Sequence, residues 1–178
     1  DNIPPGRQLL MLHNLYKDDK YKIAATTLRN QISWQPRNQV GGFWHKLKYP
    51  SQMWLDGLYM VEPFYADYAK RNNQPQAYND IINQFVWMEK YSRDAKTGLL
   101  YHGWDESKLQ RWANPKTGLS PEFWSRSMGW YMMALVDVLE ILPANHLRRI
   151  ELVNILNIIT KKTLYLLMIF FLLQKLTI

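Results

Sequence analysis

Hydrophobic residues recur at helical spacing along most of this chain. One apolar stripe runs through residues 9–16 and a second through residues 21–32, each with the three- and four-residue spacing of one helix face. The polar turn between them contains Asp18 and Asp19, whose carboxylates can cap the second helix. Two helices joined by so short a turn predict an antiparallel helical hairpin.

The same unit recurs further along the chain. Residues 55–71 and 75–92 predict a second hairpin, joined by the polar turn Asn72-Asn73-Gln74. A further helix is predicted over residues 123–142, where Pro143 stops it.

Long loops rich in glycine, proline and aromatic residues separate these helices, over residues 34–44 and 93–121. The two loops contain similar sequences, Gly41-Gly42-Phe43-Trp44-His45 at the first loop and Gly98-Leu99-Leu100-Tyr101-His102 in the second. No segment is a strong strand candidate. Repeated helical hairpins stack into solenoids or close into toroids. Long aromatic loops at one end of the hairpins favour a toroid, so we predict an all-α fold with its site at that mouth.

The composition changes near the end of the chain. From Ile150 it turns to Ile, Leu, Asn, Lys and Thr, and residues 164–173 form an apolar run that is too short for the roughly 20 residues of a membrane-spanning helix. We therefore predict a helical-hairpin domain over residues 1–146 and an atypical tail over residues 147–178. A change of reading frame or a truncation would explain the tail; a buried terminal helix is the alternative.

Composition and charge narrow the function. The chain of 178 residues has 14% aromatic residues, including 8 Trp and 11 Tyr. Such rings pack on the apolar faces of sugars in carbohydrate clefts, although many rings simply form core. The net charge of +7 includes +4 from Leu147 onward and leaves no basic stripe elsewhere, so we expect no nucleic-acid partner. The absence of cysteine excludes disulfides and thiolate metal sites.

Two segments, Tyr49–Met60 and Pro121–Met132, carry the candidate chemistry. In each, a tryptophan stands two residues before a charged residue, and a glycine and an apolar helical run follow. The charge is an acid in the first segment, Asp56 after Trp54, and a base in the second, Arg126 after Trp124. An aromatic pocket that holds both a carboxylate and a guanidinium suits an acidic sugar.

Asp56 is the best candidate for a catalytic acid, because burial at the start of a helix would keep it protonated. Its alternative role is a helix cap. Arg126 shares a helix face with Trp130 and could hold a carboxylate with two hydrogen bonds, or form an ion pair with Glu122.

Three other residues are weaker candidates. His45 and His102 occupy matching loop positions and could donate hydrogen bonds to a sugar, whereas Asp1, at another entry from loop to helix, could tune the first carboxylate. The 4 histidines have no paired spacing, so we expect no metal site and no cofactor. The sequence contains no phosphate-binding loop, nucleophile elbow or dinucleotide fingerprint.

The candidate segments resemble the unsaturated rhamnogalacturonyl hydrolases of glycoside hydrolase family 105, relatives of the unsaturated glucuronyl hydrolases of family 88. The resemblance covers residues 1 to about 142 and rests on four motifs in the same order. These are Gly41-Gly42-Phe43-Trp44-His45, Gln52-Met53-Trp54-Leu55-Asp56-Gly57-Leu58-Tyr59-Met60, Tyr101-His102-Gly103-Trp104-Asp105 and Phe123-Trp124-Ser125-Arg126-Ser127-Met128-Gly129-Trp130.

The resemblance implies part of an (α/α)6 toroid and a pectin-degrading bacterial enzyme of cytoplasm or periplasm, with the compartment left open. Such enzymes remove a 4,5-unsaturated galacturonyl residue from rhamnogalacturonan oligosaccharides by hydrating its C4=C5 double bond. By motif, Asp56 would be the general acid and base, and Asp1 the second acid. The substrate-binding residues implied are His45, His102, Trp54, Trp124, Arg126 and Trp130.

The chain also departs from the family. A complete toroid needs roughly twice this length, and the tail does not match the family pattern. An inactive helical-hairpin fragment that binds sugars weakly, or self-associates through exposed apolar surface, is therefore the alternative function. A polysaccharide lyase toroid is a third possibility, but no Tyr/His or Asn/His pair is singled out. We expect no membrane partner.

Overall fold

The computed structural model describes residues 2–176, with side chains up to Leu164. It consists of helices and one two-stranded sheet. The elements are α1 (Pro5–Tyr16), α2 (Asp19–Trp34), β1 (Gln52–Trp54), α3 (Leu55–Arg71), α4 (Ala77–Ser92), β2 (Gly103–Asp105), α5 (Ser125–Ile141) and α6 (Arg149–Leu176).

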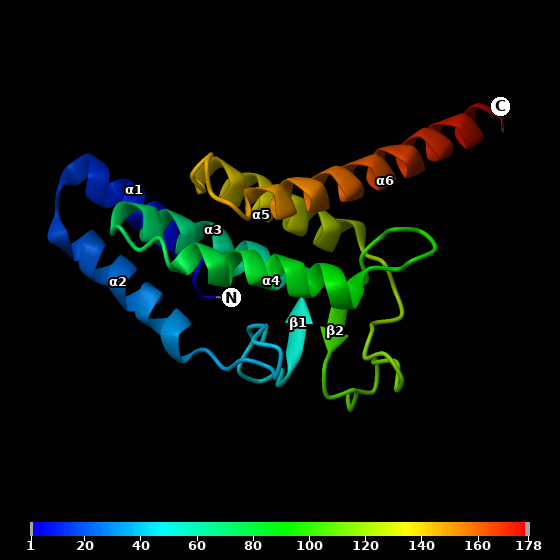
Figure 1. The fold of residues 1–178 in the computed structure, drawn as a ribbon, viewed down its shortest axis with the longest axis horizontal. Helices are drawn as coiled ribbons and strands as arrows, with labels where there is room; N and C mark the ends of the chain where they lie inside the picture. The colour runs from blue at the N-terminus through cyan, green and yellow to red at the C-terminus, as the bar shows by residue number, and fades with distance from the viewer. Residues whose placement is uncertain (1, 177–178) are drawn as a thin grey trace.

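The helices form three consecutive hairpins, α1/α2, α3/α4 and α5/α6 (Figure 1). The first helices of the hairpins make one layer, in which α3 packs against α5 and α1. The second helices pack against this layer, and α6 contacts both α5 and α4. The all-α prediction of repeated helical hairpins is confirmed.

Local sequence sets several of the helix ends as expected. Helix α2 is capped by Asp18, whose carboxylate accepts a hydrogen bond of 3.0 Å from the backbone nitrogen of Lys20. Helix α3 has the predicted bounds, and α5 ends two residues before Pro143. Helix α4 starts at Ala77, two residues after the proline of the preceding turn.

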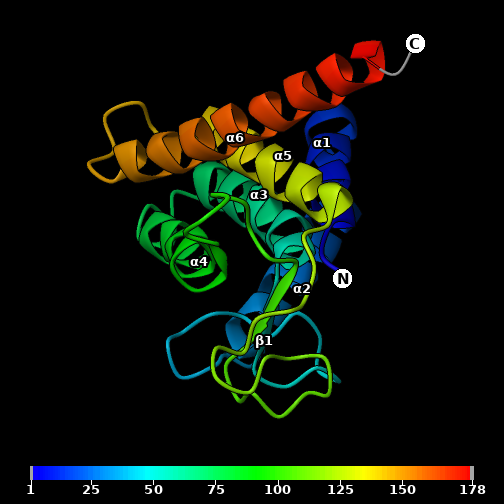
Figure 2. The ribbon, with the colours of Figure 1, turned by 90° about the vertical axis from the view of Figure 1, so that its right-hand side faces the viewer.

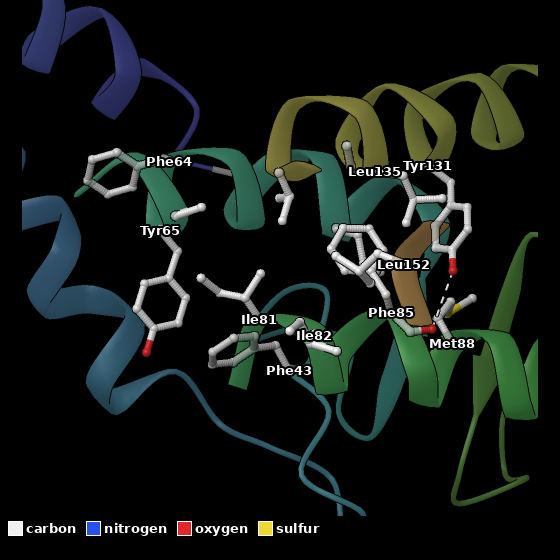
Figure 3. Close-up of a cluster of buried hydrophobic side chains, with 14 of the residues drawn as sticks. Phe43, Phe64, Tyr65, Ile81, Ile82, Phe85, Met88, Tyr131, Leu135 and Leu152 are labelled. Carbon is white, nitrogen blue, oxygen red and sulfur yellow. Dashed lines mark hydrogen bonds between the residues drawn. The ribbon is translucent and has the colours of Figure 1, made fainter. Parts of the chain in front are cut away.

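The core lies between α3, α4 and α5 (Figure 3). Phe85 of α4 faces Tyr131 of α5, with ring centroids 5.6 Å apart, and both side chains are fully buried, as are Ile81 and Leu135. The Tyr131 hydroxyl donates a hydrogen bond of 3.3 Å to the backbone oxygen of Phe85. This pairing lets a large aromatic residue be buried without leaving its hydroxyl unmatched.

The long loops meet at one end of the helices (Figure 2). There β1 pairs with β2 in antiparallel register, with Trp54 opposite Gly103 and Gln52 opposite Asp105. The expectation that no strand would form is therefore wrong for two three-residue segments. A strand this short shows no readable alternation of side chains, and its pairing depends on contacts between distant loops.

The first part of the predicted tail belongs to the core. Leu152, Ile155 and Ile159 of α6 are buried, between 0% and 6% exposed. Across the part of the chain that the structure describes, no helix has the length and apolarity to cross a membrane. The boundary at residue 147 stays a prediction.

Asp105 organises the loop after β2. One carboxylate oxygen accepts hydrogen bonds from the backbone nitrogen and hydroxyl of Ser107, at 3.1 and 2.7 Å. The other accepts from the backbone nitrogens of Leu109 and Gln110, both at 3.0 Å. The side chain is fully buried, so the four bonds replace its hydration.

Asp105→Asn should therefore destabilise the fold, because an amide nitrogen cannot accept the hydrogen bonds of the oxygen it replaces. We expect the free energy of unfolding, measured in urea, to fall by about 1.5–3 kcal/mol. Asp94→Asn is the matched control, since Asp94 caps an exposed turn through Thr97; its loss should be clearly smaller. Equal losses would contradict the organising role of Asp105.

Candidate active site

Asp56 lies in the first turn of α3, where the chain passes directly from β1 into the helix. Its residue is 8% exposed, and its Oδ2 atom is buried without a hydrogen-bond partner among the described residues. Nδ1 of His102 lies 3.5 Å from Oδ2. The carboxyl group is therefore held at a helix start with capacity left to act on another molecule.

His102 is fixed on both sides by backbone hydrogen bonds. Its carbonyl oxygen accepts from the nitrogen of Leu55 at 3.1 Å, and its nitrogen donates to the oxygen of Glu122 at 3.2 Å. In the side chain, Nδ1 lies 2.6 Å from the hydroxyl oxygen of Ser127, and the tautomer decides which group donates. Burial lowers the pKa of His102, Asp56 opposes this, and the charge of Arg126 lowers it further.

Trp54 joins the two predicted histidines. Its ring stacks on His45, with centroids 4.5 Å apart and planes at 10°, and lies 4.9 Å from the ring of His102. Tyr49 stacks on the same ring at 5.2 Å. The Trp54 indole nitrogen donates to Gln52 at 3.0 Å, which fixes the ring's orientation.

The start of α5 forms the facing wall. Trp124, the residue before α5, packs edge-on against His102 with centroids 5.0 Å apart. The guanidinium carbon of Arg126 lies 3.8 Å from the centroid of the Trp124 ring. One turn further along α5, Trp130 contacts Tyr59 of α3 at 4.5 Å.

The structure thus gathers the predicted site residues at the mouth end of α3 and α5. Asp56 and His102 lie at its centre, and His45, Trp54, Trp124 and Arg126 are linked to them through ring contacts, whereas Trp130 contacts Tyr59. Asp1 lies outside the described residues, so its predicted role stays a prediction. Among the residues that are described, no group of three His, Asp or Glu side chains could hold a metal ion.

A cavity of about 510 Å³ adjoins this cluster. Trp54, His45 and Gly57 contribute to its lining, so the Trp54 ring is shared between the cavity and the acid–histidine cluster. A volume of this size is typical of pockets for small molecules.

Sequence reasoning missed the residues that position the predicted ones. Ser127 is fully buried and holds His102, Gln52 holds the Trp54 ring, and Tyr49 extends the ring stack. All three stand inside the two aromatic segments, only one to four residues from a predicted site residue. Their closeness to the predicted residues was a signal that they belong to the site. Their roles, however, depend on contacts that the sequence alone does not show.

Comparison with known proteins identifies the family. The sequence profile of Glycosyl Hydrolase Family 88 matches residues 1–165. The chain belongs to this family. Among solved structures, it is similar to a family 105 glycoside hydrolase from Clostridium acetobutylicum (C. acetobutylicum ATCC 824), with 49% identity and a TM-score of 0.88 over 90% of this chain and 44% of that one.

More distant relatives agree. A possible member of family 105 from Salmonella enterica matches with 27% identity and a TM-score of 0.74, over 89% of this chain and 42% of that one. The unsaturated 3S-rhamnoglycuronyl hydrolase of Formosa agariphila is 27% identical over 160 residues, which are 83% of this chain and 35% of that protein. The predicted resemblance to the family 105 and family 88 enzymes is confirmed, as is the partial (α/α)6 toroid. The chain spans less than half the length of these relatives.

His45 gives the site a measurable pH signature. Burial, with help from nearby positive charge that includes Lys46, lowers the pKa of His45 to about 4 from the ordinary 6.5. Between about pH 6.5 and about pH 4, His45 is therefore protonated in the unfolded chain and neutral in the folded chain. Folding stability contributed by a neutral His45 is complete above this window and is lost as the pH falls through it.

We expect the free energy of unfolding to fall more steeply with decreasing pH in the wild type than in His45→Asn, by up to about 1.4 kcal/mol per pH unit. Urea unfolding at a series of pH values checks this. His13→Asn, which removes a histidine from α1, controls for the loss of a titratable ring. Identical pH slopes in the wild type and His45→Asn would contradict burial of the neutral ring.

The absence of a side chain at Gly57 leaves space for the His45 ring. A Cβ atom at residue 57 would lie 2.9 Å from Nδ1 of His45, so we expect Gly57→Ala to push the ring off Trp54. The near-ultraviolet circular dichroism of the stacked rings should change. The control Gly129→Ala places its methyl group in open space on α5, and it should leave the spectrum unchanged and add about 0.5–1 kcal/mol of stability. A Gly57→Ala spectrum like the wild type would refute the close approach.

Proposed function

We propose that this chain carries the catalytic end of an unsaturated rhamnogalacturonyl hydrolase, which removes a 4,5-unsaturated galacturonyl residue from rhamnogalacturonan oligosaccharides. The observation that supports this best is the buried Asp56 carboxyl, 3.5 Å from His102. The His102 ring packs against Trp124, and Arg126 lies over the Trp124 ring. An acid, a hydrogen-bonding ring and a guanidinium in one cluster of side chains suit an unsaturated uronate.

Asp56 acts first as a general acid. In its protonated form it gives its proton to C4 of the enol ether, and positive charge develops at C5 and the ring oxygen. The carboxylate left behind stabilises that charge and then takes a proton from the water that adds at C5. The hemiketal opens, and the hemiacetal that results at C1 releases the neighbouring sugar. One water is consumed, and Asp56 regains its proton.

The surrounding side chains hold the substrate. The exposed Arg126 suits the uronate carboxylate, because a guanidinium can donate two parallel hydrogen bonds to it. His102 is largely uncharged at neutral pH, since burial lowers its pKa, and it can donate to or accept from a sugar hydroxyl. Trp54, Trp124 and Trp130 offer ring faces, with His45 behind Trp54.

The choice of substrate rests on similarity. A relative with 27% identity is called an unsaturated 3S-rhamnoglycuronyl hydrolase, which supports an unsaturated uronate linked to rhamnose. The four motifs in order favour a galacturonyl residue from pectin.

The test is the ultraviolet absorbance of an unsaturated galacturonyl-rhamnose disaccharide, because hydration destroys its conjugated double bond. We expect the wild-type chain to remove this absorbance and Asp56→Asn to lower kcat by about 10²–10⁴-fold. Asp67→Asn is the control on the same helix, where Asp67 pairs with Arg71 at 2.8 Å, and it should keep the wild-type rate.

Two results would overturn the proposal. An Asp56→Asn variant as active as the wild type would exclude Asp56 as the acid. A folded wild-type chain with no activity would favour the alternative, an inactive helical-hairpin fragment. Size-exclusion chromatography would then show whether it self-associates through exposed apolar residues such as Met11 and Met133.

A further inference from the structure

The hydroxyl group of Ser127 is buried beside the ring of His102. Ser127 lies in the first turn of α5 and is fully buried, and its Oγ atom lies 2.6 Å from Nδ1 of His102. Among the residues that the structure describes, this nitrogen is the hydroxyl group's only hydrogen-bond partner. A buried hydroxyl hydrogen needs an acceptor, because a buried donor without a partner is costly. This favours Ser127 as the donor and Nδ1 as the acceptor.

The direction of this hydrogen bond decides the tautomer of His102. A neutral imidazole carries one hydrogen, so a ring whose Nδ1 accepts must carry that hydrogen on Nε2. Burial lowers the pKa of His102, which keeps the ring neutral at neutral pH. The side chain is 18% exposed, and its hydrogen bond to the described residues is made by Nδ1. The Nε2–H group is then free to bind a ligand.

The surroundings of Asp56 agree with this tautomer. Its Oδ2 atom lies 3.5 Å from Nδ1 of His102, yet it is buried without a hydrogen-bond partner among the described residues. A hydrogen on Nδ1 would give the Asp56 carboxylate a donor and so stabilise its charged form. A lone pair on Nδ1 that already accepts from Ser127 gives Asp56 no such donor.

We propose that Ser127 is a positioning residue that fixes His102 in its Nε2–H tautomer. This tautomer has two consequences for the site. The Nε2–H group can donate a hydrogen bond to the substrate, and Nδ1 donates none to Asp56, whose carboxyl group therefore keeps the proton that it delivers to C4. The second consequence rests on the function proposed above, whereas the tautomer itself is independent of turnover.

The first experiment measures the tautomer by NMR of isotope-labelled wild-type protein at neutral pH. The chemical shift of a ring nitrogen that carries a hydrogen differs from that of one that does not. The chain has 4 histidines, so comparison with His102→Gln assigns the signals. We expect His102 to carry its hydrogen on Nε2. A hydrogen on Nδ1 in the folded wild type would overturn the proposal.

Ser127→Ala removes the donor to Nδ1. The hydrogen should then move to Nδ1, where it faces Asp56, and the shifts of the two His102 ring nitrogens should change accordingly. Ser92→Ala is the matched control, because Ser92 is also fully buried and its hydroxyl donates to the sulfur of Met88 at 3.6 Å. The control should leave the His102 signals unchanged. An unchanged tautomer in folded Ser127→Ala would contradict the role of the hydroxyl group.

Two further variants separate the effect of Ser127 from that of Asp56. Asp56→Ala leaves the hydroxyl group in place and should keep the Nε2–H tautomer, because Ser127 still donates to Nδ1. Ser127→Thr also keeps a hydroxyl group at this position and should keep the same tautomer. A hydrogen on Nδ1 in either variant, when folded, would mean that Ser127 does not decide the tautomer.

The pH profile of kcat tests the consequence for Asp56. A general acid must be protonated, so kcat declines on the high-pH side of its profile. In Ser127→Ala the Nδ1–H group stabilises the carboxylate, so this decline should begin at a lower pH. We expect kcat to fall by about 10-fold at neutral pH and by less in acid. His45 and Arg126, whose charges also act on this pair, are the same in both chains.

The two measurements fail separately. A loss of kcat that is equal at every pH would overturn the effect of Ser127 on Asp56. A wild-type chain without activity would instead reject the proposed function, and the nitrogen shifts of His102 would still decide whether Ser127 sets the tautomer.

Discussion

The site depends on the backbone pairing of two loops. Trp54 stands opposite Gly103 in the β1–β2 ladder, and the nitrogen of Leu55 continues the pairing by donating to the oxygen of His102. These bonds place the first turn of α3 beside His102 and so set the 3.5 Å separation of the acid and the ring. Helix packing alone brings α3 and α5 together, but it does not fix the position of a loop residue to this accuracy.

The histidine side chains in the aromatic cluster around Trp54 are mostly uncharged. Burial lowers the pKa of both His45 and His102, so the rings around Trp54 are mostly neutral at neutral pH. Asp56 and Arg126 stand beside this ring cluster, one in the first turn of α3 and the other in the first turn of α5. A low-polarity surrounding strengthens the interaction of each with a charged or polarised substrate.

Helices were predictable because their signals are local. The stripe over residues 9–16, the Asp18 cap and Pro143 each act within one or two turns. The Asp56 and Arg126 segments were also readable, since residue type and spacing carry their chemistry. The residues that position them were not predictable. Ser127 contacts His102 in another loop, and each three-residue strand is defined only by its pairing with the other. The buried start of α6 likewise depends on the surface that α4 and α5 present to it.

The three-hairpin layout also governs when the site can appear as the chain folds. Each hairpin is built from contacts close in sequence, which form early and at low entropic cost. The Trp54–His102–Ser127 contacts join residues from three separate segments, so they can close only after α3 and α5 have packed. The His102–Ser127 hydrogen bond therefore reports that tertiary folding of the site is complete, whereas helix content reports only the early formation of the hairpins.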